Sequence, residues 1–199
     1  METVPESDPQ PAMRQIARRL AYENPWLTVT EDDIELLDGT RSIYGVVHKP
    51  DFAVVIALEG DRIHLVEQYR YTIGRRRWEL PQGVAAHATS PEGIAAAELA
   101  EETGLRAEQF TVLGFLNLAY GCMTSGFHVV LATGLTQGAT DREVTEQDMQ
   151  SRWFTIDEMW RMIDVGEISD SPSLAALALL ARSGYESTST MIRPKGPAS

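Results

Sequence analysis

Short runs of apolar and β-branched residues, separated by turn residues, recur along most of the chain and predict a β-sheet. The two strongest runs are residues 52–58 (FAVVIAL) and 63–70 (IHLVEQYR), and the turn signal Glu59-Gly60-Asp61 joins them. Three further segments are expected to be strands: 111–120, 127–135 and 152–156. The middle of the chain is therefore expected to be built on a sheet.

Three segments carry helix signals instead. In the clearest one, Ser90 can cap the first turn, Pro91 suits the first helical position and Gly104 supplies a left-handed stop. Two more helices, residues 157–165 and 171–183, are expected after the last strand. Strands and helices in this order predict the α/β class, with a mixed sheet between helices in an α/β/α sandwich.

The first fifty residues show weaker patterns. Residues 13–26 (MRQIARRLAYENPW) predict a short basic helix that ends near Asn24-Pro25, because a residue before proline avoids the helical region. Two strands of a hairpin-like piece are expected after it. The predicted organisation is a flexible tail (1–12), an N-terminal extension of a helix and strands (13–50), one main domain (51–183) and a second flexible tail (184–199).

Composition excludes several classes of protein. A chain of 199 residues with 43% apolar content can build one domain with a full core. The formal charge of −12 makes nucleic acid an unexpected partner, because affinity for phosphate backbones comes largely from excess Lys and Arg. A lone Cys122 excludes an internal disulfide. With no signal peptide and no long apolar run, we expect a cytoplasmic protein without a membrane partner.

The helix that starts at Pro91 carries Glu98, Glu101 and Glu102 near its C-terminal end. Carboxylates at this spacing are neighbours on one face, and they lie at the end where the helix dipole is also negative. No Lys or Arg lies between Pro91 and Leu105, so a divalent cation is the simplest counter-charge. Carboxylate oxygens suit Mg²⁺ or Mn²⁺. The alternative is a solvated acidic surface helix.

This segment resembles the signature of the Nudix hydrolase family, G-x5-E-x7-R-E-U-x-E-E-x-G-U, in which U is an apolar residue. Seven residues match in register: Gly83, Glu98, Leu99, Glu101, Glu102, Gly104 and Leu105. Two positions depart from it, because Thr89 stands where the family has its first Glu and Ala97 where it has Arg. In the family this Arg orients the metal-binding carboxylates, and Arg106 is a candidate replacement here.

The resemblance extends to the ADP-ribose pyrophosphatase branch of the family. Residues 66–83 (VEQYRYTIGRRRWELPQG) resemble its lead-in to the signature, and residues 153–180 resemble its closing helices. The resemblance implies a Nudix-type sandwich with a small N-terminal β extension, and a homodimer. It also implies hydrolysis of the pyrophosphate in a nucleoside diphosphate derivative, ADP-ribose or a related nucleotide sugar.

The resemblance also assigns residues to roles. It makes Glu98 and Glu102 the principal metal ligands, Glu101 a further ligand or catalytic base, and the backbone carbonyl of Gln82 an additional ligand. Arg70 is expected to contact the substrate, since guanidinium groups suit phosphate oxygens. Glu79 is expected to bind the substrate or the metal, or to brace the turn that follows it.

Several members of the branch place a general base in the loop after the strand that ends near residue 135. The candidates in this loop are Glu143 and Glu146, of which we favour Glu146, although acidic loop residues are usually solvated. Two other functions stay open. Thr89 and Ala97 are compatible with a Nudix domain that binds a nucleotide with little or no cleavage, and a dinucleoside polyphosphate hydrolase is the third possibility.

Overall fold

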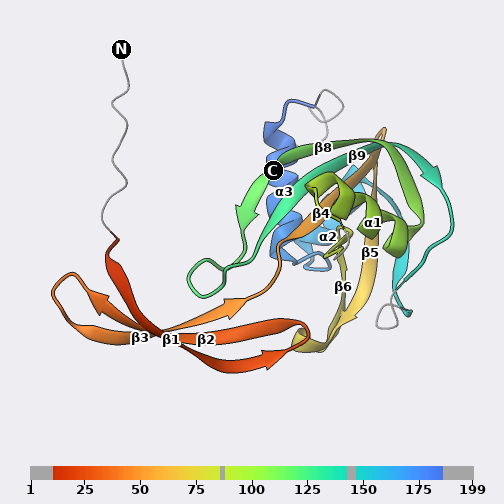
Figure 1. Ribbon diagram of the computed structural model, residues 1–199. Coiled ribbons are helices and arrows are strands. Elements are labelled where there is room, and N and C mark those ends of the chain that lie inside the picture. The colour runs from red at the N-terminus through yellow and green to blue at the C-terminus, as the bar shows by residue number, and fades with distance from the viewer. Residues whose placement is uncertain (1–10, 86–87, 143–146, 186–199) are drawn as a thin grey trace, which may run out of the picture. The chain divides into compact units, whose positions relative to one another are not determined.

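The computed structural model describes residues 11–85, 88–142 and 147–185, so the two predicted tails lie almost entirely outside the described residues. The chain forms two compact units (Figure 1). One contains the described residues up to Lys49 together with Ala119–Ser125. The other contains Pro50–Leu118 and the described residues from Gly126 onward.

The first unit is an antiparallel sheet of three strands in the order β1-β2-β3. The strands are β1 (Met13–Asn24), β2 (Leu27–Leu36) and β3 (Arg41–His48). The predicted hairpin is confirmed as the pairing of β2 with β3. The second part of the unit attaches to β3 through backbone bonds, in which Val47 donates to Cys122 at 2.8 Å and Thr124 donates to Val47 at 3.1 Å.

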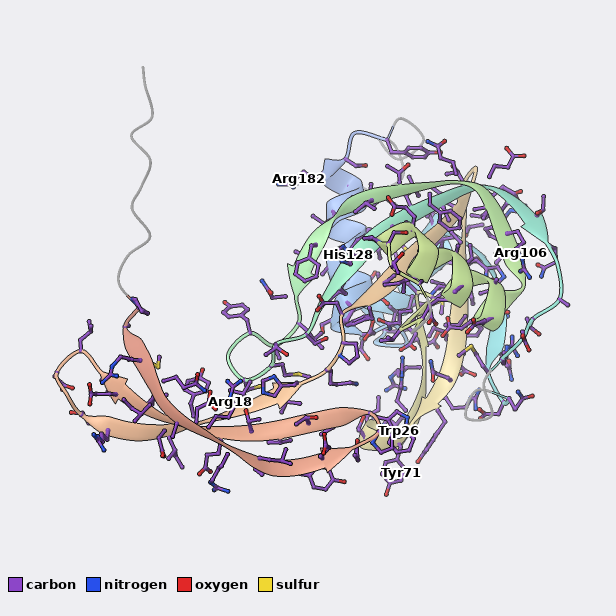
Figure 2. The ribbon with its side chains drawn as sticks, in the orientation of Figure 1. Arg18, Trp26, Tyr71, Arg106, His128 and Arg182 are labelled. Atoms are coloured by element: carbon purple, nitrogen blue, oxygen red, sulfur yellow. The ribbon has the colours of Figure 1, made fainter. Side chains whose placement is uncertain are left out.

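The prediction of a basic helix at residues 13–26 is wrong, because this segment is strand β1. The antiparallel register sets its three arginines directly opposite acidic residues of β2: Arg14 opposite Glu35, Arg18 opposite Asp32, and Arg19 opposite Glu31. All three pairs form ion pairs, and Arg18, labelled in Figure 2, donates two hydrogen bonds of 2.7 Å to the Asp32 carboxylate. Cross-strand pairs of opposite charge stabilise a sheet. The acidic partners lie on β2, so residues 13–26 alone carry no signal for this pairing.

The second unit is built on a mixed sheet, as predicted, and this sheet has seven strands. Its main path is β10-β5-β4-β9-β8, with β6 paired to β5 and β7 paired to β4. The pair β4–β9 is parallel, and the others are antiparallel. The strands are β4 (Phe52–Glu59), β5 (Arg62–Arg70), β6 (Arg75–Glu79), β7 (Gln82–Gly83), β8 (Leu105–Asn117), β9 (Gly126–Gln137) and β10 (Gln150–Thr155).

Side chains of β4 alternate between two apolar cores, which makes the sheet the middle layer of a sandwich. Val54 and Ile56 belong to the core shared with α2 (Ile156–Asp164) and α3 (Ser171–Arg182). Ala53 and Val55 belong to the core shared with α1 (Pro91–Thr103). This arrangement confirms the predicted α/β/α fold and places α1 on the opposite face from α2 and α3.

Two strands differ from their predicted extent. β8 begins at Leu105, directly after α1, and not near residue 111. The arginine-rich residues before Trp78, for which no strand was predicted, form strand β6 after a single 3-10 turn (Tyr71–Ile73). Arg76 there pairs with Glu67 at 2.8 Å and with Asp148 at 2.6 Å.

Among the described residues no helix combines the length and apolar character needed to cross a bilayer.

His64 is a buried histidine on β5 with 3% of its surface exposed. Its ring meets the edge of Trp153 at a centroid distance of 4.9 Å, and within the described ranges its Nδ1 has no hydrogen-bond partner. Burial lowers the pKa of His64 from 6.5 to about 4. The folded protein therefore holds this imidazole neutral where an unfolded chain would protonate it.

We expect the free energy of unfolding to fall as the pH is lowered from 6.5 to about 4, because over this range only the unfolded His64 takes up a proton. The loss of unfolding free energy due to His64 is absent above this pH range and reaches at most about 3 kcal/mol below it. Urea unfolding at several pH values measures it. His64→Phe, which keeps a ring beside Trp153, should flatten the pH dependence. Equal pH slopes for wild type and His64→Phe would contradict the assignment.

Candidate active site

The turn after β6 is fixed to the centre of the sheet. Gln82 and Gly83 form the two-residue strand β7, which pairs with Val54 and Ala53 of β4. The amide of Val55 donates a 2.8 Å hydrogen bond to the carbonyl of Pro81. These backbone contacts set the position of Gln82 and Gly83 independently of any ligand.

Helix α1 begins and ends as the sequence predicts. The Ser90 side chain accepts a hydrogen bond from the Gly93 amide at 3.1 Å, and Pro91 occupies the first turn. Gly104 has a φ of 75°, and its amide bonds to the carbonyl of Ala100. The face of α1 that carries Glu98 and Glu102 is directed at β7.

The two predicted principal ligands, Glu98 and Glu102, converge on β7. Glu102 is 1% exposed, and its Oε2 accepts a 3.2 Å hydrogen bond from the Gln82 amide. Glu98 is 7% exposed, and its carboxylate lies so close to Gly83 that a Cβ added there would overlap it. Glycine at position 83 therefore makes the space that the Glu98 carboxylate occupies.

The donor chemistry of this place fits a hard divalent cation. Two buried carboxylates and the Gln82–Gly83 backbone offer only oxygen ligands, which are those that Mg²⁺ and Mn²⁺ prefer. Glu101 belongs to the same last turn of α1 and is half-buried. In the part of the chain that the structure describes, no group of three or more His, Cys, Asp or Glu side chains is arranged to bind a metal ion. The candidate ligands from the protein are thus the carboxylates of Glu98 and Glu102, which lie beside the backbone of Gln82 and Gly83.

Arg70 and Glu79 form an ion pair beside this place. Glu79 is 2% exposed and accepts hydrogen bonds from Gln68 at 2.9 Å and from both Nε and Nη2 of Arg70. Burial raises the pKa of Glu79, although Arg70 opposes the shift. Burial acts to lower the pKa of Arg70, but the charges of Glu79, Asp170 and Glu102 raise it. The geometry favours the bracing role for Glu79, with the partly exposed Arg70 held near the carboxylates.

Asp170 and Ser173 also hold the turn, although neither was predicted to belong to the site. Asp170 Oδ2 accepts from the Ser173 amide at 2.9 Å, from the Ser173 hydroxyl at 2.8 Å and from Gln82 Nε2 at 3.0 Å. Ser173 Oγ accepts from the Leu80 amide at 2.9 Å. The segment Asp170-Ser171-Pro172 is a recognisable helix start. Nothing local in it indicates that the cap also bonds Gln82.

Arg142 was also missed. Its Nε donates a 2.9 Å hydrogen bond to the backbone carbonyl of Glu102, so a cation from 40 residues along the chain serves the end of α1. A cation therefore reaches this end of α1 although α1 itself contains no Lys or Arg. Arg106, the candidate replacement for the family arginine, lies where β8 begins (Figure 2) and bonds the Gly104 carbonyl at 3.1 Å. The favoured base, Glu146, lies outside the described residues, as does Glu143.

Comparison with known proteins agrees with this geometry. A model of the NUDIX domain matches residues 47–177, and a model of the nucleoside diphosphate sugar hydrolase N-terminal domain matches residues 13–47. An ADP-ribose pyrophosphatase of Mycobacterium tuberculosis is 40% identical over 140 residues, which cover 69% of this chain and 67% of the relative. A CMP-5'-(N-acetyl-N-hydroxy-3-aminopropyl)phosphonate hydrolase of Streptomyces rubellomurinus is 29% identical over 176 residues, 86% of this chain and 85% of the relative.

The fold is shared with solved structures as well. A crystal structure of an ADP compounds hydrolase superposes with a TM-score of 0.78 at 18% identity, and the match covers 88% of this chain and 96% of the other. The chain therefore belongs to the Nudix family. Its resemblance to the ADP-ribose pyrophosphatase branch is confirmed, and it is a pyrophosphohydrolase of nucleoside diphosphate derivatives, a chemistry that in this family uses a divalent metal.

Gly83→Ala should displace the Glu98 carboxylate, because the new methyl group would occupy its place. We expect affinity for Mg²⁺ or Mn²⁺ and the turnover rate to fall on the order of tenfold or more. The thermal midpoint should change little, since the end of a flexible side chain can move. Calorimetric metal titration and steady-state kinetics test this, with Gly45→Ala as the matched control because open space surrounds Gly45. Wild-type metal affinity in Gly83→Ala would show that Glu98 is not a ligand.

Proposed function

We propose that this protein is a Mg²⁺- or Mn²⁺-dependent hydrolase that cleaves the pyrophosphate of ADP-ribose or a related nucleotide sugar. The observation that carries the proposal is the convergence of the Glu98 and Glu102 carboxylates on Gln82–Gly83. The ADP-ribose pyrophosphatase of Mycobacterium tuberculosis among its relatives supports the choice of substrate. We further propose that the enzyme is a cytoplasmic homodimer, in which the three-stranded N-terminal sheet contributes to the dimer.

Glu98, Glu102 and the carbonyl of Gln82 would hold the metal, with Glu101 as a further ligand or base. Mg²⁺ at phosphate sites commonly takes one or two carboxylates and completes its shell with water and substrate oxygens, which suits a pair of carboxylates. When bound, the metal neutralises pyrophosphate charge and lowers the pKa of an attacking water. The protein's own part is to hold these oxygens in fixed positions before the substrate arrives.

Arg70 would contact a phosphate of the substrate. Glu79, which also accepts a hydrogen bond from Gln68, restricts the motion of the Arg70 guanidinium, and 40% of the Arg70 side chain stays exposed for such a contact. Asp170 and Ser173 fix the turn that carries Gln82. The negative charge of the substrate would thus be neutralised by the Arg70 guanidinium and by the metal. Hydrogen bonds hold Arg70 on Glu79 and the proposed ligand Glu102 on the Gln82 backbone amide.

Removal of the metal should abolish turnover. We expect ADP-ribose to yield AMP and ribose 5-phosphate in the presence of Mg²⁺ or Mn²⁺, and no product in excess chelator. A Glu101→Gln/Glu102→Gln double variant, run beside a panel of nucleoside diphosphate derivatives, tests the assignment. Undiminished activity in chelator would refute the metal site. ADP-ribose binding without AMP release would identify a nucleotide-binding module, and cleavage of dinucleoside polyphosphates alone would identify the third function.

Glu146→Gln tests the proposed general base. If Glu146 removes the proton from the attacking water, the substitution should lower the turnover rate on the order of a hundredfold or more while leaving metal affinity unchanged. Rate against pH for the wild type and the variant separates loss of a base from loss of binding. Glu143→Gln is the matched control in the same loop. A near-normal rate for Glu146→Gln would remove it from the mechanism.

A further inference from the structure

The last turn of α1 depends on a distant segment for its hydrogen bonds. The final carbonyls of a helix have no partners within the helix, and α1 has no basic residue in its last turn. Residues 137–142 supply the partners. The Asp141 amide bonds the Glu101 carbonyl at 3.1 Å, Arg142 Nε bonds the Glu102 carbonyl at 2.9 Å, and Gln137 Nε2 bonds the Thr103 carbonyl at 3.0 Å.

Arg142 makes more of these connections than its neighbours do. Besides the Glu102 carbonyl, its guanidinium donates to the carbonyl of Met149 and to Ser151 Oγ, the latter at 3.3 Å. Its own carbonyl accepts a 2.7 Å bond from Gln147 Nε2. One planar guanidinium therefore joins the end of α1 to the entry into β10.

The residue held by this guanidinium is a candidate metal ligand. The Glu102 carbonyl bonds Arg142, while its carboxylate bonds the Gln82 amide. The two contacts fix Glu102 at both its backbone and its side chain, which leaves few directions in which the carboxylate can move. Within α1 itself no arginine does this, because Ala97 stands where the family signature has one.

We propose that Arg142 is a positioning residue for the metal site, and that it compensates for the missing arginine at position 97 by holding the turn that carries Glu101 and Glu102. The inference rests on the proposed function, since it assumes that these carboxylates bind the metal. Arg142 acts through the backbone of Glu102 and does not touch the metal or the substrate. Lysine could retain the charge, but its single ammonium cannot reproduce the planar fork that spans three acceptors.

The test measures metal affinity directly, by calorimetric titration of the full chain with Mg²⁺ and with Mn²⁺ in the absence of nucleotide. Arg142→Ala should weaken metal binding ten- to a hundredfold, a range typical of lost support around a ligand. Arg142→Lys should fall between wild type and Arg142→Ala. Gln137→Ala is the matched control, because Gln137 serves the same helix end through the Thr103 carbonyl and should leave metal affinity within about threefold of wild type.

A merely structural role would lower the thermal midpoint and leave the metal affinity of the folded fraction unchanged, so thermal unfolding is recorded for every variant. Restoring the family arginine with Ala97→Arg in the Arg142→Ala background should recover part of the lost affinity. Wild-type metal affinity in Arg142→Ala, or no recovery with Ala97→Arg, would overturn the inference. A wild-type protein that binds neither metal would refute the proposed function itself, whereas metal binding without turnover would refute only the activity.

Discussion

The contact on which this site depends is the packing of two glutamate side chains of α1 against two consecutive residues of β7. Glu102 accepts a hydrogen bond from the Gln82 amide, and Glu98 occupies the space left by Gly83. Burial of two carboxylates at one place is unfavourable unless their oxygens are bonded or bind a cation. The rest of the unit serves to keep them there, since β4 anchors β7 and the apolar face of α1 packs on the same strand.

The parts of the fold that could be predicted from the sequence are those governed by local rules. Ser90, Pro91 and Gly104 define α1 by themselves, and the apolar run of β4 marks a buried strand whichever strands lie next to it. The signature then places Glu98 and Gly83 in register, and the structure brings them into contact. The helix and strand signals are each carried within a few residues, and the family signature supplies the longer register that relates Gly83 to Glu98.

The parts that could not be predicted depend on partners far along the chain. Arg18 favours a strand only because Asp32 lies opposite, and the basic segment alone suggests a helix. The end of α1 is acidic in sequence, yet Arg142 supplies a cation from another element. Asp170 is a visible helix cap, but its bond to Gln82 joins residues 88 positions apart. Only tertiary packing reveals such bonds.

The bond between Asp170 and Gln82 has a consequence for biosynthesis. The turn at residues 80–83 is synthesised before α3, but Asp170 and Ser173 must be present before Leu80 and Gln82 gain their side-chain partners. A chain that stops short of α3 would carry every residue of the signature and still lack the final constraint on its geometry. The hydrogen bonds that hold Leu80 and Gln82 can therefore form only after the first turn of α3 has been synthesised.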